Sequence, residues 1–359
     1  MLFDPLTFRN GVRARNRVWL APMTNQQSEP DGALGEAELH WLALRARAGF
    51  GVIETCAAHV SRDGQAWPGE LGIYDDHLLP GLRRLATTLR DAGALGLVQL
   101  FHGGVRASSK LTGEQVWSAS AGAQPGSEQA RAATAADLAR VIGDFRDAAV
   151  RAHAAGFAGV ELHGAHGYLL TQFLSVTANR RDDEWGGSLE HRARLMREAL
   201  RAVRRAVPDS FVVGIRLSPE DRGNAVGLDL DDNVQVARWL CEDGADFIHL
   251  SLWDWTKPTH KRPDEHAVTV FRAALPADRP IVAAGMVWTR DDADGLLAKG
   301  ADAVALGRAA IANPDWAERA RDATWQPRRP PLTRAELVER GLSAPFAEYM
   351  RNWRGFVAD

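Results

Sequence analysis

The stretch HAAGFAGVELH, residues 153–163, contains the pattern that decides the fold. A helical segment ends at a small residue and Gly156, and a short, almost entirely apolar run follows within two residues. Glycine suits the left-handed position at which helices stop, and so apolar a run is typical of a strand buried on both faces. The same pattern recurs around the glycines at positions 49, 93, 244 and 300. Repeated helix–glycine–strand units predict a parallel α/β fold.

Eight strands can be placed along the chain, each followed by a helical stretch. The expected strands lie near residues 18–22, 52–56, 95–100, 159–163, 212–217, 247–251, 280–284 and 303–306. The expected helices lie near residues 35–48, 76–92, 135–155, 190–206, 231–243, 265–274, 290–299 and 314–323. Eight such units predict a TIM (β/α)8 barrel. A doubly wound sheet is the alternative, and it is disfavoured because no G-x-G-x-x-G motif opens any helix.

The barrel domain is expected to cover residues 1–323, with an N-terminal hairpin over residues 1–17 around an Asn-Gly turn. Residues 324–359 are expected to form a C-terminal extension, and the proline-rich segment 327–331 marks the end of the barrel. This extension contains the aromatic residues Phe346, Tyr349, Trp353 and Phe356. Four aromatic side chains need a surface to pack on. Either the chain's own barrel or a neighbouring subunit could supply that surface.

Composition excludes several classes of protein. The 359 residues are 45% hydrophobic and 25% charged, and 46 acidic against 43 basic residues give a net charge of −3. That balance argues against nucleic acid or an anionic membrane as a partner. The two cysteines, Cys56 and Cys241, are too few for a disulfide framework, a four-cysteine zinc site or an iron–sulfur cluster. Because no signal peptide or membrane-spanning stretch is found, we expect a cytoplasmic protein.

The loop after the fourth expected strand is rich in groups that carry chemistry. In a TIM barrel the reaction takes place where the strands run into these loops, and here His163, His166 and Tyr168 lie within six residues. A metal site is one interpretation, but no third ligand completes the set. The other is a pair of hydrogen-bond donors that hold one oxygen atom, beside a phenol that can give a proton. We therefore expect no metal.

The last two strands end in residues that suit a phosphate group. Gly285 follows the seventh strand, and Gly307 and Arg308 follow the eighth. The loops after these strands are the usual phosphate site of a TIM barrel. Glycine allows backbone N–H groups to approach phosphate oxygens, and arginine can add a charge-assisted contact.

Four stretches resemble the Old Yellow Enzyme family of FMN-dependent ene-reductases. They are RNRVWLAPMT (15–24), HGAHGYLLTQFLS (163–175), the run from Asn179 to Ser188, and LGRAAIANPDW (306–316). The resemblance covers the whole barrel and implies FMN across its mouth, with NADH or NADPH as hydride donor. The implied FMN-binding residues are Ala21, Pro22, Met23, Thr24, Ala57, Gln99, Arg216, Gly285, Gly307 and Arg308. Gln99 would pair with the pyrimidine edge, and Arg216 would stabilise the reduced flavin.

The resemblance also implies a reaction in two halves. Hydride passes from the reduced flavin N5 to the β-carbon of an α,β-unsaturated carbonyl compound, and Tyr168 donates a proton to the α-carbon. His163 and His166 hold the carbonyl oxygen, and Trp253 joins them in binding the substrate. Alternatives are a flavin barrel that reduces nitro compounds, nitrate esters or quinones, and a non-redox barrel lyase or isomerase acting on a phosphorylated substrate. A non-catalytic flavin- or phosphate-binding barrel would leave Tyr168 unexplained.

Assembly is expected to be homo-oligomeric, as a dimer or a tetramer. In some members of the family a tail arginine from a neighbouring subunit reaches the active site. In this chain Arg351 and Arg354 are the candidates for that role.

Overall fold

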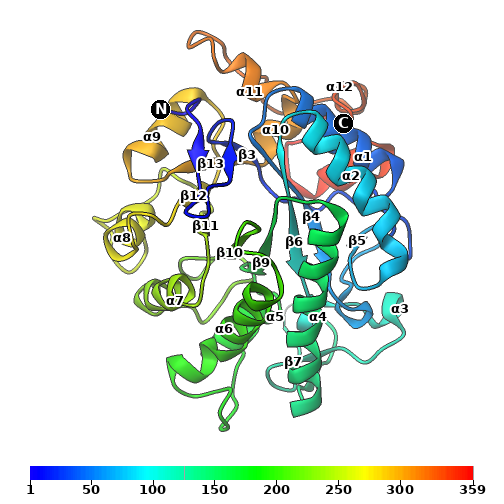
Figure 1. Cartoon of the computed structure of the whole chain (residues 1–359), viewed down its shortest axis with the longest axis vertical. Coiled ribbons are helices and arrows are strands. Elements are labelled where there is room, and N and C mark those ends of the chain that lie inside the picture. Colours follow the sequence, from blue (N-terminus) through cyan, green and yellow to red (C-terminus); the bar gives the residue numbers. More distant parts are fainter. Residues whose placement is uncertain (125, 359) are drawn as a thin grey trace.

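A closed barrel of eight parallel strands forms the centre of the computed structural model, which describes residues 1–124 and 126–358 (Figure 1). Successive strands along the chain are neighbours, and the last pairs with the first to close the barrel. The strands are β3 (Val18–Leu20), β4 (Val52–His59), β6 (Leu95–Phe101), β9 (Gly159–Gly164), β10 (Val212–Leu217), β11 (Phe247–Ser251), β12 (Ile281–Ala284) and β13 (Ala303–Leu306). The TIM-barrel prediction is confirmed, and every predicted strand overlaps an observed one.

Helices follow the strands on the outside of the barrel. The predicted helices correspond to α1 (Glu36–Arg47), α2 (Leu79–Asp91), α4 (Ala135–Ala155), α6 (Leu189–Ala206), α7 (Leu230–Glu242), α8 (Ala267–Ala274), α9 (Arg290–Ala298) and α11 (Trp316–Arg319). The predicted helix at 314–323 is too long. After Arg319 the backbone bonds of Arg321, Asp322 and Trp325 each span three residues, which is the spacing of turns.

Shorter elements complete the loops. They are β1 (Leu6–Thr7), β2 (Arg13–Ala14), β5 (Leu71–Gly72), α3 (Ser109–Thr112), β7 (Trp117–Ser118), β8 (Arg131–Ala132), α5 (Leu169–Leu174), α10 (Arg308–Ala312), α12 (Arg334–Glu339), α13 (Ala344–Tyr349) and the 3-10 turns η1 (Arg62–Gly64), η2 (Asp76–Leu78), η3 (Gly104–Arg106) and η4 (Met350–Asn352).

The predicted role of the five repeat glycines is confirmed. Their φ angles run from +75° at Gly93 to +109° at Gly244, where glycine alone is unstrained.

The interior of the barrel is apolar at the end where the strands begin. The predicted N-terminal hairpin, formed by β1 and β2, closes this end. The ring of Phe8, after β1, packs at a tilt against Trp19 and Phe247, with its centre 6.1 Å and 6.0 Å from theirs. Gly214 makes room for this layer, since a Cβ there would lie 2.1 Å from the ring of Phe247.

Two residues further along several of the strands, the interior of the barrel becomes polar. Glu54 follows Val52 on β4, Glu161 lies on β9, and His249 follows Phe247 on β11. All three are buried. Side chains of a strand alternate between its two faces, so this step of two keeps them pointing into the barrel. The polar layer therefore lies between the apolar layer and the loops that hold the chemistry.

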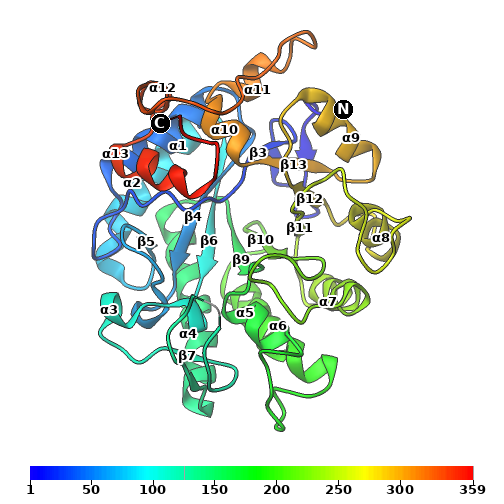
Figure 2. The same cartoon turned by 180° about the vertical axis from the view of Figure 1, so that it is seen from behind.

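The C-terminal extension, whose residue 359 lies outside the described residues, packs on the barrel helices. In Figures 1 and 2 its helices α12 and α13 (red) lie beside α1 (blue). Phe346 is fully buried, and its ring meets the edge of Trp41 of α1 at 5.4 Å. The Ser343 backbone N–H donates to Gln27, and Arg45 donates to the Arg340 carbonyl. The tail thus contacts its own barrel, while docking on a neighbouring subunit stays a prediction.

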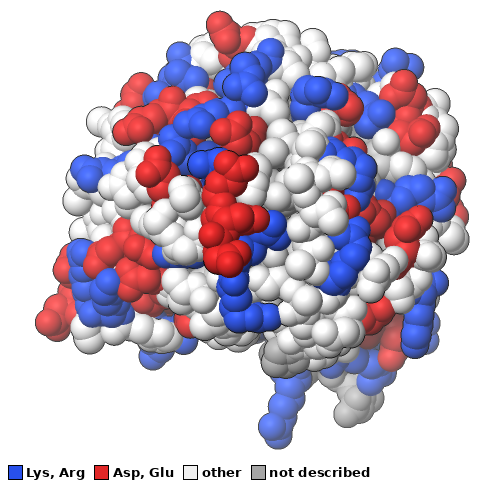
Figure 3. Space-filling model, turned by 90° about the horizontal axis from the view of Figure 1, so that it is seen from below, with Lys and Arg blue, Asp and Glu red and all other residues white. Residues whose placement is uncertain are grey.

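The surface carries both signs of charge. Figure 3 shows basic and acidic side chains interspersed over one face of the molecule, which gives that face no continuous basic surface for a nucleic-acid backbone. No helix within residues 1–124 and 126–358 combines the length and the apolar character needed to cross a membrane.

Candidate active site

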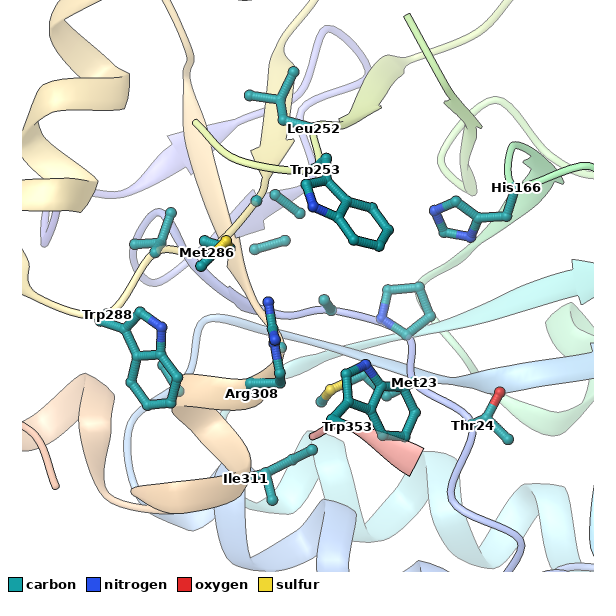
Figure 4. A pocket seen from close by; sticks show the side chains of 18 of the residues that line it. Met23, Thr24, His166, Leu252, Trp253, Met286, Trp288, Arg308, Ile311 and Trp353 are labelled. Carbon is teal, nitrogen blue, oxygen red and sulfur yellow. The ribbon is translucent and has the colours of Figure 1, made fainter. Parts of the chain in front are cut away.

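A cavity of about 330 Å³ opens where the barrel strands end (Figure 4). Its walls come from the loops after β3, β9, β10, β11, β12 and β13 and from the C-terminal extension. The predicted site residues that line it are Ala21, Pro22, Met23, Thr24, His166, Arg216, Trp253, Gly285, Gly307 and Arg308. Most of the residues predicted to bind the cofactor therefore face one space.

Four predicted site residues lie outside the walls of this cavity. Ala57 and Gln99 are buried in the barrel wall on β4 and β6, where they are 5% and 2% exposed. His163, the last residue but one of β9, is buried beside His166. Tyr168 contributes to a second cavity, of about 470 Å³, beside Trp67 and Arg106.

The predicted cluster of two imidazoles and a phenol forms at the end of β9. The ring of His163 lies 5.0 Å from that of His166 and 4.9 Å from that of Tyr168, centre to centre. His166 has a φ of +62°, which is uncommon for a residue with a side chain. Its backbone is held by Ser218, whose Oγ accepts from the His166 N–H, and by Arg106, which donates to its carbonyl at 2.8 Å.

Burial sets the protonation of this cluster. Loss of solvent lowers the pKa of His163 well below 6.5, and the neighbouring His166 and Arg216 lower it further. The pKa of His166 is lowered in the same way, by burial and then by Arg216 and Arg106. Burial raises the pKa of Tyr168, and Arg106 partly offsets that rise. Both imidazoles are therefore neutral at pH 7, and the phenol keeps its proton.

Sequence reasoning missed Arg106 and Ser251. The Arg106 guanidinium lies over the Tyr168 ring, with its Cζ 4.3 Å from the ring centre. Ser251 ends β11, and its Oγ lies 2.6 Å from Nε2 of His166 and accepts from Arg216 at 3.2 Å. The signal that could have identified Ser251 as a site residue is its position at the polar end of the sixth strand.

The C-terminal extension also supplies residues that were not predicted for the site. Tyr349, Met350 and Trp353 line the main cavity, and the Tyr349 and Trp353 rings meet edge to face at 5.0 Å. Figure 4 shows Trp353 on the side of Thr24, with Trp253 across the opening. Arg351 and Arg354 are exposed, and Arg351 pairs with Glu348. Their reach into a neighbouring active site stays a prediction.

Comparison with known proteins identifies the family. Residues 1–325 match the model of the NADH:flavin oxidoreductase / NADH oxidase family. The chain is 34% identical to the probable NADH-dependent flavin oxidoreductase YqiG of Bacillus subtilis, over 99% of this chain and 97% of that protein. It is also 34% identical to an NADPH dehydrogenase of a Geobacillus species, over 99% of both chains. Three longer relatives match over 86–89% of this chain but 33–49% of their own length.

The structural likeness agrees with the sequence match. The Old Yellow Enzyme homologue of Zymomonas mobilis superposes with a TM-score of 0.84 at 28% identity, over 97% of this chain and 99% of that one. The chain belongs to the Old Yellow Enzyme family. This member is an NAD(P)H-dependent oxidoreductase with FMN as its cofactor, as predicted. A non-redox lyase or isomerase is thereby ruled out.

The cavity of this Old Yellow Enzyme homologue has groups that fit FMN. Arg308 is half-buried, and within the described parts of the chain its guanidinium has no hydrogen-bond or ion-pair partner. Figure 4 shows it extending from the start of α10 into the cavity. In the described parts of the chain, the buried Nε–H of Arg216 has no hydrogen-bond partner. Buried donors without a partner are costly, so both guanidinium groups suit a ligand that brings phosphate and carbonyl oxygens.

Gly285 and Gly307, the two glycines predicted to bind phosphate, have different surroundings. A Cβ at Gly307 would approach only the Met23 sulfur, at 3.4 Å, so this residue faces open space at the cavity. A Cβ at Gly285 would lie 2.6 Å from the backbone oxygen of Leu252. Close packing of two loops therefore explains Gly285 without any phosphate.

We expect Arg308→Met to weaken FMN binding about ten- to hundredfold, because hydrogen bonds to a charged group contribute about 1.5–3 kcal/mol. Arg308→Lys should recover part of the loss, since it keeps the charge but not the planar fork. Fluorescence titration of the apoprotein measures both. Arg319→Met removes an exposed cation of α11 and serves as the matched control. If Arg308→Met and Arg319→Met lost the same amount of FMN affinity, that result would contradict a phosphate contact at Arg308.

Proposed function

We propose that this flavin oxidoreductase reduces the activated C=C bond of α,β-unsaturated carbonyl compounds. His163 and His166 would hold the carbonyl oxygen and Tyr168 would supply the proton. One observation carries the proposal: two neutral imidazoles and a protonated phenol converge beside the cavity that fits FMN. FMN supplies the hydride chemistry in both halves of the reaction.

His163 can donate a hydrogen bond from Nε2. Its Nδ1 accepts from the backbone N–H of Ala165 at 3.3 Å. A neutral imidazole has one N–H and one lone pair, so the proton is on Nε2. A neutral donor strengthens its interaction as negative charge develops on the carbonyl oxygen during hydride addition, which is how a donor accelerates the step.

We propose that His166 donates from Nδ1. Ser251 Oγ accepts from Arg216 and lies 2.6 Å from Nε2 of His166. With the Ser251 hydroxyl proton directed to Nε2, the proton of His166 is on Nδ1. Ser251 in this way links the orientation of His166 to Arg216, and the left-handed backbone of His166 fixes the direction of the ring.

Tyr168 is suited to give up its proton to carbon. Burial raises the pKa of its phenol above the usual value of 10, so the group is protonated at neutral pH. The Arg106 cation over the ring stabilises the phenolate that remains after transfer. Reduction of a nitro compound, nitrate ester or quinone needs no proton delivered to carbon, so this pairing favours an alkene acceptor.

Single-turnover reoxidation tests the proposal. The protein is reduced anaerobically with NAD(P)H, freed of nucleotide, and mixed with 2-cyclohexenone, nitrobenzene, a nitrate ester or benzoquinone. We expect the enone to reoxidise the flavin and to appear as cyclohexanone. Reoxidation by the other acceptors with no turnover of any enone would overturn the proposal. A homo-oligomer, and a cytoplasmic location, stay predictions.

A further inference from the structure

A layer of buried polar groups lies inside the barrel, and apart from Gln99 none of its members has a role in the reaction described above. It contains Glu54 of β4, Gln99 of β6, Glu161 of β9 and His249 of β11, with Arg216 of β10 above it. Each of these residues is 6% exposed or less. Burying so many polar groups is unfavourable unless they are paired, so their arrangement calls for an explanation.

Glu161 is the centre of this layer. Gln99 Nε2 donates to one of its carboxylate oxygens at 2.7 Å, and His249 Nδ1 lies 2.7 Å from the other. Because an ionised carboxylate can only accept hydrogen bonds, the amide of Gln99 must turn its NH2 group to Glu161. The amide oxygen of Gln99 consequently points away from Glu161, as a hydrogen-bond acceptor of fixed direction.

Glu54 differs from Glu161 although both are fully buried. Neither of its carboxylate oxygens has a hydrogen-bond partner in the described chain, and Oε1 lies 3.8 Å from Nδ1 of His249. Burial, and then the charge of Glu161, raise the pKa of Glu54 well above its usual range. Burial alone would also raise the pKa of Glu161, but His249, Arg216 and Gln99 together lower it.

The charges of the layer follow from this asymmetry. Arg216 is positive, and an ionised Glu161 balances it. A second ionised carboxylate would leave a net negative charge in a fully buried layer, which is unfavourable. One proton on Glu54 removes that charge.

We propose that Glu161 is a positioning residue for the flavin site, which orients the Gln99 amide and balances Arg216, while Glu54 holds the proton that keeps the buried layer neutral. Glu161 is not among the residues that line the main cavity, so it acts through Gln99 and Arg216. The inference rests on the FMN site and does not depend on which acceptor the enzyme reduces.

A metal ion held by Glu54, Glu161 and His249 is the competing explanation, since their ligand atoms lie within 4.8 Å of one another. The hydrogen bond between Glu161 and His249 argues against it. Its 2.7 Å length occupies the one imidazole nitrogen that faces the carboxylates, and a metal would have to replace that contact.

The flavin reduction potential tests the charge assignment. Glu161→Gln removes a negative charge beside Arg216. We therefore expect the equilibrium between reduced and oxidised flavin to shift at least tenfold toward the reduced form, which is a rise of about 30 mV in the two-electron reduction potential. Glu54→Gln replaces one neutral group by another and should leave the potential unchanged. Glu161→Asp should keep the potential but weaken FMN binding, because the shorter side chain withdraws from Gln99. Equal shifts in the two Gln variants, or none in either, would overturn the proposal.

Infrared spectroscopy tests whether Glu54 carries a proton, and it requires no variant of Glu161. The wild-type apoprotein at neutral pH should show the carbonyl band of a protonated buried carboxyl group, and Glu54→Gln should lack it. A wild-type spectrum without that band, or a stoichiometric metal in the purified protein, would refute the proton on Glu54. Enone reduction by wild-type protein would be unaffected by either result, so failure here is distinguishable from failure of the proposed function.

Discussion

Tyr168→Phe is expected to slow reoxidation of the reduced enzyme by an enone by about 10²–10⁴, the usual contribution of a general acid. The variant keeps the ring that packs on Phe101 at 4.5 Å and on His163, so the site should retain its shape. Flavin reduction by NAD(P)H transfers hydride without a proton to carbon. Its rate should stay within about twofold of wild type, because only a transition-state interaction of the other half-reaction is lost.

Stopped-flow absorbance of the flavin measures the two half-reactions separately. Tyr74→Phe is the matched control, since it removes a phenol that donates to the Asp31 carbonyl far from the cavity. Tyr349→Phe removes a phenol from the cavity wall and tests whether any nearby hydroxyl suffices. Equal slowing of both half-reactions in Tyr168→Phe, or loss of enone reduction in Tyr349→Phe alone, would remove Tyr168 from the role of proton donor.

The parts of this molecule that sequence could predict are those in which neighbours in the chain are also neighbours in space. Glycines at helix ends and the apolar runs after them are local features, and they placed five of the eight barrel strands. His163, His166 and Tyr168 lie within six residues at the end of one strand, so their meeting required no knowledge of the rest of the fold. The family resemblance then supplied the cofactor, which spacing alone left open.

Residues that meet across strands were beyond the same reasoning. Glu161 pairs in register with Gln99 on one side, and Arg216 pairs with His249 on the next strands. A shift of a strand by two residues would separate these groups without changing any pattern in the sequence. Trp353 posed the same difficulty on a larger scale. Its aromatic character indicated packing, but the face of the barrel it covers depends on the path of the whole tail.

His163→Phe is expected to lower the rate of enone reduction by about 10²–10³, the usual effect of deleting one donor to a developing oxyanion. Phenylalanine fills the space of the imidazole against Phe101 but has no N–H at the position of Nε2. Because the pKa of His163 lies well below 6.5, the wild-type donor is neutral, and its titration should not alter the rate from pH 6.5 upward. The measurement is the pH profile of enone reduction in both proteins.

Two further variants separate a lost hydrogen bond from a disturbed core. His163→Gln places an amide N–H near the position of Nε2 and should recover part of the lost rate. His153→Phe makes the same substitution on the outer face of α4, where His153 is exposed, and should leave the rate unchanged. If His163→Gln is as slow as His163→Phe while both retain FMN, shape and not hydrogen bonding is what His163 provides. A rate that climbs steeply as pH falls from 7 toward 6 would instead mean that a charged imidazole binds the carbonyl oxygen, against the neutral state that burial imposes.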